Sequence, residues 1–157
     1  HAAPQYSNHR WISERFAEVA DKLIAKYKAK IILSGDKKDK RLNDEIISLM
    51  QYNAINFAGK TNLKTFFALI KKSDIVVSVD TSAIHIAAAF NKPIVALFGA
   101  GDPEIWRPYS RDSAVIYKNE VKCTSCMMHH CDRDLGCMKS IKVEDVLESV
   151  DVLIKND

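Results

Sequence analysis

The sequence lacks the features that identify several common classes of protein. Its five glycines do not form the glycine-rich motif of a dinucleotide-binding domain or of a P-loop. No apolar run approaches the roughly 20 residues that cross a bilayer, and the chain does not open on the pattern of a signal peptide. With 23 basic and 20 acidic residues, the net charge of +3 does not favour nucleic acid or a membrane surface as a partner.

The composition is that of one globular domain over residues 1–157, since this length fits the usual size and 47% of the residues are hydrophobic. Short apolar runs alternate along the chain with amphipathic segments of helical period. Strands are predicted over residues 30–34, 54–58, 75–79, 94–98 and 114–117, and helices over 11–27, 39–50, 63–71, 83–90, 104–108 and 143–154. This alternation predicts an α/β fold with a doubly wound parallel sheet.

The stretch 73–101 has the pattern of a strand, a helix and a second strand, which together form a βαβ unit. Asp80, Thr81 and Ser82 lie where the first strand ends and the helix begins. Unpaired N–H groups at a helix N-terminus favour an anion, and the two hydroxyls add hydrogen-bond donors. His85 follows one turn later. These residues fit a phosphate site about as well as they fit an ordinary N-cap followed by a hydrogen-bonded core histidine.

Ligands of doubly wound sheets bind at the carboxyl ends of the strands. Four predicted loops occupy such ends, at residues 35–39, 58–62, 80–85 and 99–103. They hold Gly35, Asp39, Gly59, Lys60, Asp80, Thr81 and Gly99. The carboxylate of Asp39 is suited to the hydroxyls of a ribose, although a surface aspartate that caps the following helix is nearly as good an interpretation.

All four cysteines fall in the segment 123–137, with the spacing C-x2-C-x4-C-x5-C. They are Cys123, Cys126, Cys131 and Cys137. Four thiolates at this separation can close a tetrahedral zinc site, which would be structural because it leaves no position open for catalysis. Disulfides or reduced thiols fit the same spacing, so the cysteines are candidate zinc ligands with these alternatives open.

The run VVSVDTSAIHIAAAFNKPIVALFGAGDP, at residues 76–103, resembles the donor-binding half of glycosyltransferase family 9, the lipopolysaccharide heptosyltransferases. The turn Gly59-Lys60-Thr61-Asn62-Leu63 resembles another part of the family pattern. The ending from Cys123 to Val146, with its C-x-x-C and CM-x-x-I-x-x-E-x-V sequences, resembles a tail found in many members. Together the likeness covers nearly the whole chain in register.

The resemblance implies a Rossmann-like domain that forms the C-terminal half of a two-domain GT-B glycosyltransferase. The N-terminal acceptor domain, with the proposed catalytic base, is absent from this chain. The domain is then expected to bind a nucleotide sugar, above all ADP-heptose, for inverting transfer of heptose to the lipopolysaccharide core. The resemblance also implies no cofactor for catalysis and a cytoplasmic location, peripheral to the inner membrane through the full-length protein. We expect the isolated domain to be inactive.

The resemblance also assigns roles to individual residues. The implied donor-binding residues are Asp80, Thr81, Ser82, Ala83 and His85 around the diphosphate, Asp39 at the ribose, Lys60 and Thr61 beside the adenine, and Arg10 in the phosphate region. Three departures from the family pattern stand out. Ser82 replaces a usual glycine, the expected phosphate-binding lysine is replaced around His9 or Arg10, and the family's strand before His1 is absent from this chain.

Two other functions fit the sequence. One is a related domain that uses another nucleotide-sugar donor, since phosphate sites are shared while base and sugar contacts vary. The other is a zinc-stabilised binding module without transferase activity. Loss of ADP affinity on replacement of Asp80 or His85 would separate a nucleotide binder from such a module.

Overall fold

The computed structural model describes residues 1–4, 9–118, 126, 131 and 133–155, and its strands pair in parallel throughout this part. The strands are β1 (Ile32–Leu33), β2 (Ile55–Asn56), β3 (Val76–Val79), β4 (Ile94–Phe98) and β5 (Ser113–Tyr117). β1 pairs with β2, and β3, β4 and β5 form a second sheet in that order. The predicted α/β class with a parallel sheet is confirmed.

The helices follow the predicted alternation with small shifts at their ends. They are α1 (Ser13–Tyr27), the 3-10 helix η2 (Lys37–Asp39), α2 (Lys40–Leu49), α3 (Leu63–Lys72), α4 (Ser82–Ala89), α5 (Pro103–Trp106), α6 (Gly136–Ser140) and α7 (Val143–Lys155). The sequence predicted no counterpart of α6. Within the residues that the structure describes, no helix has the length and apolar character needed to cross a membrane.

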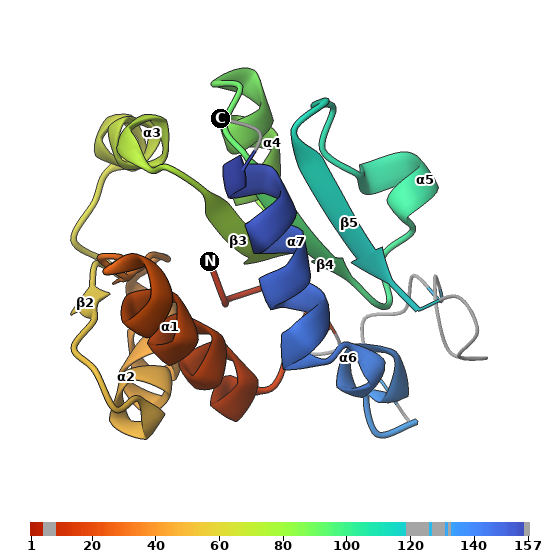
Figure 1. The fold of residues 1–157 in the computed structure, drawn as a ribbon, viewed down its shortest axis with the longest axis horizontal. Helices are drawn as coiled ribbons and strands as arrows, with labels where there is room; N and C mark the ends of the chain where they lie inside the picture. Colours follow the sequence, from red (N-terminus) through yellow and green to blue (C-terminus); the bar gives the residue numbers. More distant parts are fainter. Residues whose placement is uncertain (5–8, 119–125, 127–130, 132, 156–157) are drawn as a thin grey trace.

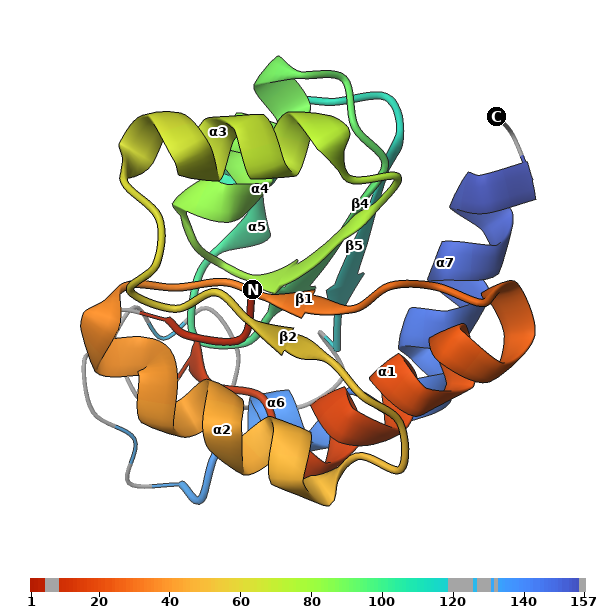
Figure 2. The ribbon, with the colours of Figure 1, turned by 90° about the vertical axis from the view of Figure 1, so that its left-hand side faces the viewer.

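The side chains of β4 alternate between two hydrophobic clusters, one on each face of its sheet. Val95 and Leu97 belong to the cluster that contains buried residues of α1 and α7, whereas Ala96 and Phe98 belong to the cluster with α3 and α4. Because successive strand residues point to opposite faces, helices cover both sides of this sheet. Figures 1 and 2 show these helices on either side of β3, β4 and β5.

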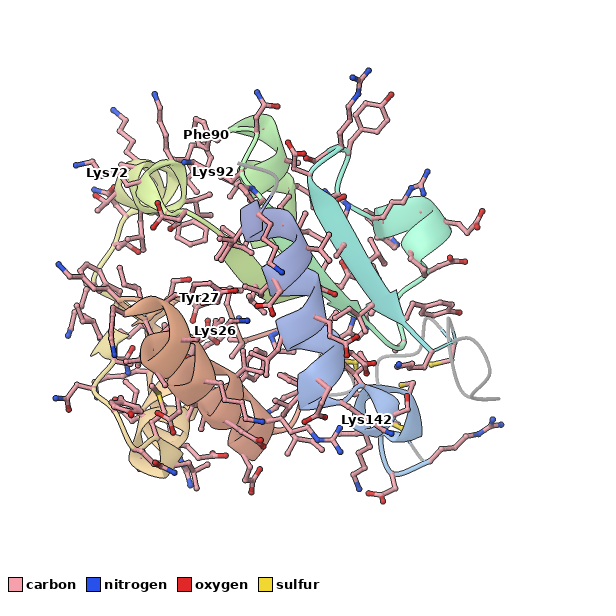
Figure 3. All side chains as sticks on the ribbon, viewed as in Figure 1. Lys26, Tyr27, Lys72, Phe90, Lys92 and Lys142 are labelled. Atoms are coloured by element: carbon pink, nitrogen blue, oxygen red, sulfur yellow. The ribbon has the colours of Figure 1, made fainter. Side chains whose placement is uncertain are left out.

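Helix α7 presents the apolar face that its sequence predicts, because Val143, Val146 and Val150 are all buried. Near its end, the Asp151 carboxylate accepts hydrogen bonds from Lys26 and from the Tyr27 hydroxyl at the end of α1. Figure 3 shows Lys26 and Tyr27 at this end of α1, which faces α7. The two helices are thus joined by polar contacts as well as through the core.

The start of the chain lies between the two groups of strands. The His1 amine donates to the Val77 carbonyl of β3 at 2.7 Å, and the His1 ring lies 3.1 Å from the Ser34 hydroxyl after β1. The Ser78 hydroxyl donates to the His1 carbonyl at 3.2 Å. The strands therefore do not form the single continuous sheet that the alternation predicts. Figure 2 shows the N-terminus between β1 and β3.

Candidate functional site

A cavity of about 790 Å³ opens at the carboxyl ends of the strands, where the sequence predicts a ligand. Loops after β1, β2, β3 and β4 all contribute to its wall. Its lining residues are His1, Ala3, Pro4, His9, Gly35, Asp36, Lys38, Asp39, Thr61, Asn62, Leu63, Phe66, Asp80, Thr81, Ser82, His85, Gly101 and Trp106. Its size is within the range of small-molecule and cofactor sites.

The N-terminus of α4 forms the middle of this wall. The Thr81 hydroxyl accepts from the Ala83 N–H at 3.3 Å, so Thr81 is the N-cap of α4. A second hydrogen bond of 3.1 Å joins this hydroxyl to that of Ser78. The N-cap interpretation of Thr81 is therefore confirmed. Ser82 is exposed at the first position of the helix and lines the cavity, so this turn can still offer hydrogen bonds to an anion.

His85 lies on the cavity side of α4 and is exposed. The alternative of a core histidine is therefore wrong, and the ring is accessible to a ligand beside the N-terminus of the helix. Its neighbour Ala83 is 1% exposed and belongs to the hydrophobic cluster with α3 and α4. Ala83 therefore contributes backbone and packing rather than a side chain that reaches the cavity.

Asp80 faces His9 and Gly101 in the cavity wall. The Asp80 carboxylate lies 3.6 Å from Nδ1 of His9, and both side chains are mostly buried. A Cβ atom added at Gly101 would overlap the Asp80 carboxylate and would lie 3.4 Å from the His9 ring. Because Gly101 has no side chain, the Asp80 carboxylate and the His9 ring can occupy these positions.

Asp39 follows β1 and lies within a reciprocal capping arrangement. Its Oδ2 atom accepts from the Asp36 N–H at 2.8 Å, while the Asp36 carboxylate accepts from the Lys38 N–H at 2.8 Å. Partial burial, together with the negative charge of Asp36, raises the pKa of Asp39. Asp39 thus completes the capping box of η2 and lines the cavity, but its side chain does not cap α2, the helix that the alternative interpretation assigned to it.

The loop after β2 packs closely against the loop that carries Asp39. Gly59 has a φ of 71°, and a Cβ atom there would lie 2.9 Å from Cα of Lys37. The Gly59 N–H donates to the Gly35 carbonyl at 3.1 Å. Asn62 caps α3 as predicted, by accepting from the Thr65 N–H at 2.9 Å. These contacts hold Thr61 and Leu63 beside Asp39.

Six of the predicted donor-binding residues line this one cavity. They are Asp39, Thr61, Asp80, Thr81, Ser82 and His85. Lys60 is exposed but is not a lining residue. Arg10 is directed elsewhere, because its guanidinium donates to Glu45 at 3.0 Å and to the Ser13 hydroxyl at 2.9 Å. At this point of the chain it is His9 that reaches the cavity.

Sequence reasoning missed Lys38, Phe66 and Trp106 as members of the wall. The Lys38 ammonium lies 3.2 Å from the Asp36 carboxylate at the cavity rim. Phe66 and Trp106 sit on predicted helices whose orientation no local pattern reveals. The signal that could have found them is their position just after the carboxyl end of a strand.

The cysteines differ in their surroundings. Cys137 is 3% exposed and packs in the hydrophobic cluster with α1 and α7. The Cys131 sulfur accepts from the N–H groups of Arg133 and Leu135, both at 3.4 Å, and Cys126 is exposed. Cys123 lies outside the described residues. In the part of the chain that is described, no group of three possible ligands could hold a metal ion, so the zinc hypothesis gains no support there.

Comparison with known proteins gives a consistent result. The family profile described as Glycosyltransferase family 9 (heptosyltransferase) matches residues 1–135. Lipopolysaccharide heptosyltransferase 3 of Escherichia coli is 32% identical over 146 residues, which cover 92% of this chain and 43% of that protein.

Solved structures agree with the family match. The E. coli ADP-heptose lps heptosyltransferase II aligns with a TM-score of 0.83 at 26% identity, over 99% of this chain and 45% of the other. The E. coli heptosyltransferase WaaC with ADP aligns with a TM-score of 0.75 over 97% of this chain and 42% of the other. Its identity is 18%, so this second likeness bears on the fold alone. The chain spans less than half the length of the relatives that it matches.

Proposed function

Because the chain belongs to glycosyltransferase family 9, the heptosyltransferases, we propose that its cavity binds the nucleotide-sugar donor of a heptosyl transfer to the lipopolysaccharide core. The observation that carries this proposal is that six residues predicted to bind the donor line one cavity. They come from loops far apart in the sequence. ADP-heptose is the proposed donor, in agreement with the sugar nucleotide in the name of the related E. coli ADP-heptose lps heptosyltransferase II.

The proposed placement of the diphosphate is the N-terminus of α4. Backbone N–H groups at a helix N-terminus favour negative charge, and Ser82 offers a hydroxyl at the same turn. The His85 ring lies on the cavity wall and can donate a hydrogen bond, and the Lys38 ammonium on the same wall can add positive charge. These groups would stabilise the negative charge that develops on the diphosphate as it leaves.

The proposed placement of the nucleoside is the end of the cavity formed by Asp39 and Thr61. One oxygen of the Asp39 carboxylate accepts the Asp36 N–H, and a carboxylate has further acceptor sites for ribose hydroxyls. Leu63 and Phe66 add apolar surface to the same wall, which suits the flat face of a base. The base would then lie against the loop after β2.

In the proposed reaction, an acceptor hydroxyl of the lipopolysaccharide core attacks the anomeric carbon of the heptose. The bond from that carbon to the diphosphate breaks, and the configuration is inverted. A general base outside the residues described here would take the hydroxyl proton. The residues described here would hold the nucleotide and stabilise the leaving group, so we propose that this chain alone does not transfer sugar.

Calorimetric titration of the chain with ADP, UDP and GDP tests the proposal. We expect ADP to bind more tightly than the other two. We expect Thr81→Val and His85→Ala each to weaken ADP by roughly 10- to 150-fold, because each loses one hydrogen bond to a charged group. Ser48→Ala, which removes an exposed hydroxyl on α2 remote from the cavity wall, is the matched control. Equal or absent binding of all three nucleotides would contradict the proposal, and preference for UDP or GDP would change the donor.

A further inference from the structure

The two tryptophans of the chain have opposite surroundings. Trp11 is 1% exposed and donates its indole N–H to the Ile141 carbonyl at 3.1 Å, so it belongs to the core. Trp106 is 46% exposed and lines the cavity. A large aromatic side chain left half exposed in the wall of a cavity offers apolar area that a ligand can cover.

Trp106 is held in a fixed turn. Asp102 caps α5 by accepting the Glu104 N–H at 2.9 Å, and its carbonyl accepts the Trp106 N–H at 2.9 Å. Pro103 occupies the first turn, where its fixed φ suits a helix start. The loop that carries this turn also contains Gly101, which contacts Asp80 and His9. The loop after β4 thus places Trp106 on the part of the cavity wall next to Asp80.

The order of the strands separates the loop that carries Trp106 from the loops of the proposed nucleoside site. Thr61 follows β2, Asp39 follows β1, Asp80 follows β3 and Trp106 follows β4. β2 and β1 pair at one side, and β3 lies at the near edge of the other sheet with β4 behind it. A nucleotide with its ribose at Asp39 and its diphosphate at α4 would thus carry its sugar toward Asp80 and Trp106.

We infer that Trp106 forms the sugar-contacting wall of this site, by stacking its indole on an apolar face of the transferred sugar. The inference rests on the proposed function and deepens it. Sugars present C–H groups on one face and hydroxyls at their edges, and a flat aromatic ring matches the C–H face. Trp106 is then a specificity-determining residue for the sugar and not for the nucleotide.

The test compares ADP with ADP-heptose as ligands of the wild-type chain and of Trp106→Ala, Trp106→Phe and Ile105→Ala. Ile105 is 64% exposed on the same short helix and does not line the cavity, so it is the matched control. We expect Trp106→Ala to weaken ADP-heptose by roughly 3- to 10-fold, as for a lost aromatic contact, and to leave ADP unchanged. Trp106→Phe should retain part of the affinity, and Ile105→Ala all of it.

Fluorescence gives a second measurement on the wild-type chain. Because Trp11 is buried, quenching by acrylamide reports chiefly on Trp106, and we expect ADP-heptose to protect the indole more than ADP does. Equal loss of both ligands in Trp106→Ala, or no loss of either, would overturn the inference while ADP binding by the wild type still supports the proposed function. If the wild type binds neither ligand, the proposed function fails and the inference falls with it.

Discussion

Thr81 shows why single residues allow two interpretations. Its hydroxyl caps α4, and the same residue lines the cavity. Both roles fit a helix start, because a capping side chain and a bound anion can each accept hydrogen bonds from its unpaired N–H groups. Asp39 is similar, since one of its oxygens completes the capping box of η2 while the side chain lines the wall. A local pattern cannot separate these roles, because ligand binding depends on loops that converge only in the fold.

The charge of Asp39 gives a prediction about pH. Burial raises the pKa of Asp39, so its carboxyl takes up a proton at a higher pH than an ordinary aspartate does. At neutral pH we expect Asp39→Asn to weaken ADP by roughly 3- to 10-fold, because an amide oxygen accepts ribose hydroxyls less strongly than a carboxylate. As the pH falls through the raised pKa, the wild-type carboxyl becomes neutral and its advantage over the variant disappears.

Calorimetry of ADP binding at a series of pH values checks this prediction. The ratio of the two dissociation constants is the quantity of interest, since the titration of ADP itself affects both proteins equally. A ratio that stays constant as the pH falls would show that Asp39 ionisation does not contribute to binding.

Gly99 and Gly101 form a natural pair for comparing packing with binding. A Cβ atom at Gly99 would overlap Met138 and lie 2.9 Å from the Cys137 sulfur in the core, whereas one at Gly101 would overlap Asp80. We expect Gly99→Ala to lower the free energy of unfolding by about 1–3 kcal/mol, as overpacked cores do. We expect Gly101→Ala to act mainly on ligand binding, by displacing Asp80 and His9.

Urea denaturation and ADP-heptose titration of both variants check the pair. The expected pattern is a crossed one, with the larger stability loss in Gly99→Ala and the larger affinity loss in Gly101→Ala. Both variants losing affinity equally at full stability would contradict the placement of the sugar beside Gly101.

At the scale of elements, periodicity predicted most of the helices and strands. A continuous apolar run placed β4 at its observed bounds, and α7 buries the face that its sequence indicates. The sequence did not predict helix α6, because five residues are too few to show a helical period. Cys137 and Met138 lie in α6, and both side chains are buried in the hydrophobic core.

The junction between β5 and α7 gives an element-scale prediction. The Asp145 carboxylate accepts from the Lys118 ammonium at 2.7 Å and from the Lys142 N–H at 2.7 Å. Although partial burial opposes ionisation, these two donors lower the pKa of Asp145. A lowered pKa in the folded state stabilises the fold above the unfolded-state pKa, and this stability is lost as the pH falls through the folded-state value.

We therefore expect Asp145→Asn to lower the free energy of unfolding by about 1 kcal/mol at neutral pH. The difference from the wild type should shrink in acid. Denaturation at several pH values measures it, with Glu148→Gln, an exposed position on the same helix, as the control. A stability difference that does not change with pH would show that the charge of Asp145 is not responsible.

At the scale of the whole molecule, the fold class followed from the alternation of elements, but the break between the sheets did not. β1 and β3 do not pair, and His1 bonds to Ser34 and to Val77 between them. No local pattern indicates which strands will be neighbours, because pairing depends on contacts between distant residues. The position of the cavity, in contrast, followed from the rule that ligands bind at the carboxyl ends of parallel strands.

Loops from both groups of strands form the wall of the cavity. Loops after β1 and β2 form the proposed nucleoside end, the start of α4 forms the proposed diphosphate site, and the loop after β4 forms the proposed sugar end. We therefore propose that one nucleotide sugar spans these loops in that order.

Backbone amide mapping by NMR during titration with ADP tests this claim most directly. We predict that the largest shifts occur at the amides of residues 36–39, 60–63 and 81–85, which line or adjoin the proposed nucleotide site. Addition of ADP-heptose should extend the shifts to Gly101 and Trp106. Shifts that gather instead on the outer faces of α1 and α7, or amides around the cavity that do not respond to ADP, would contradict the account.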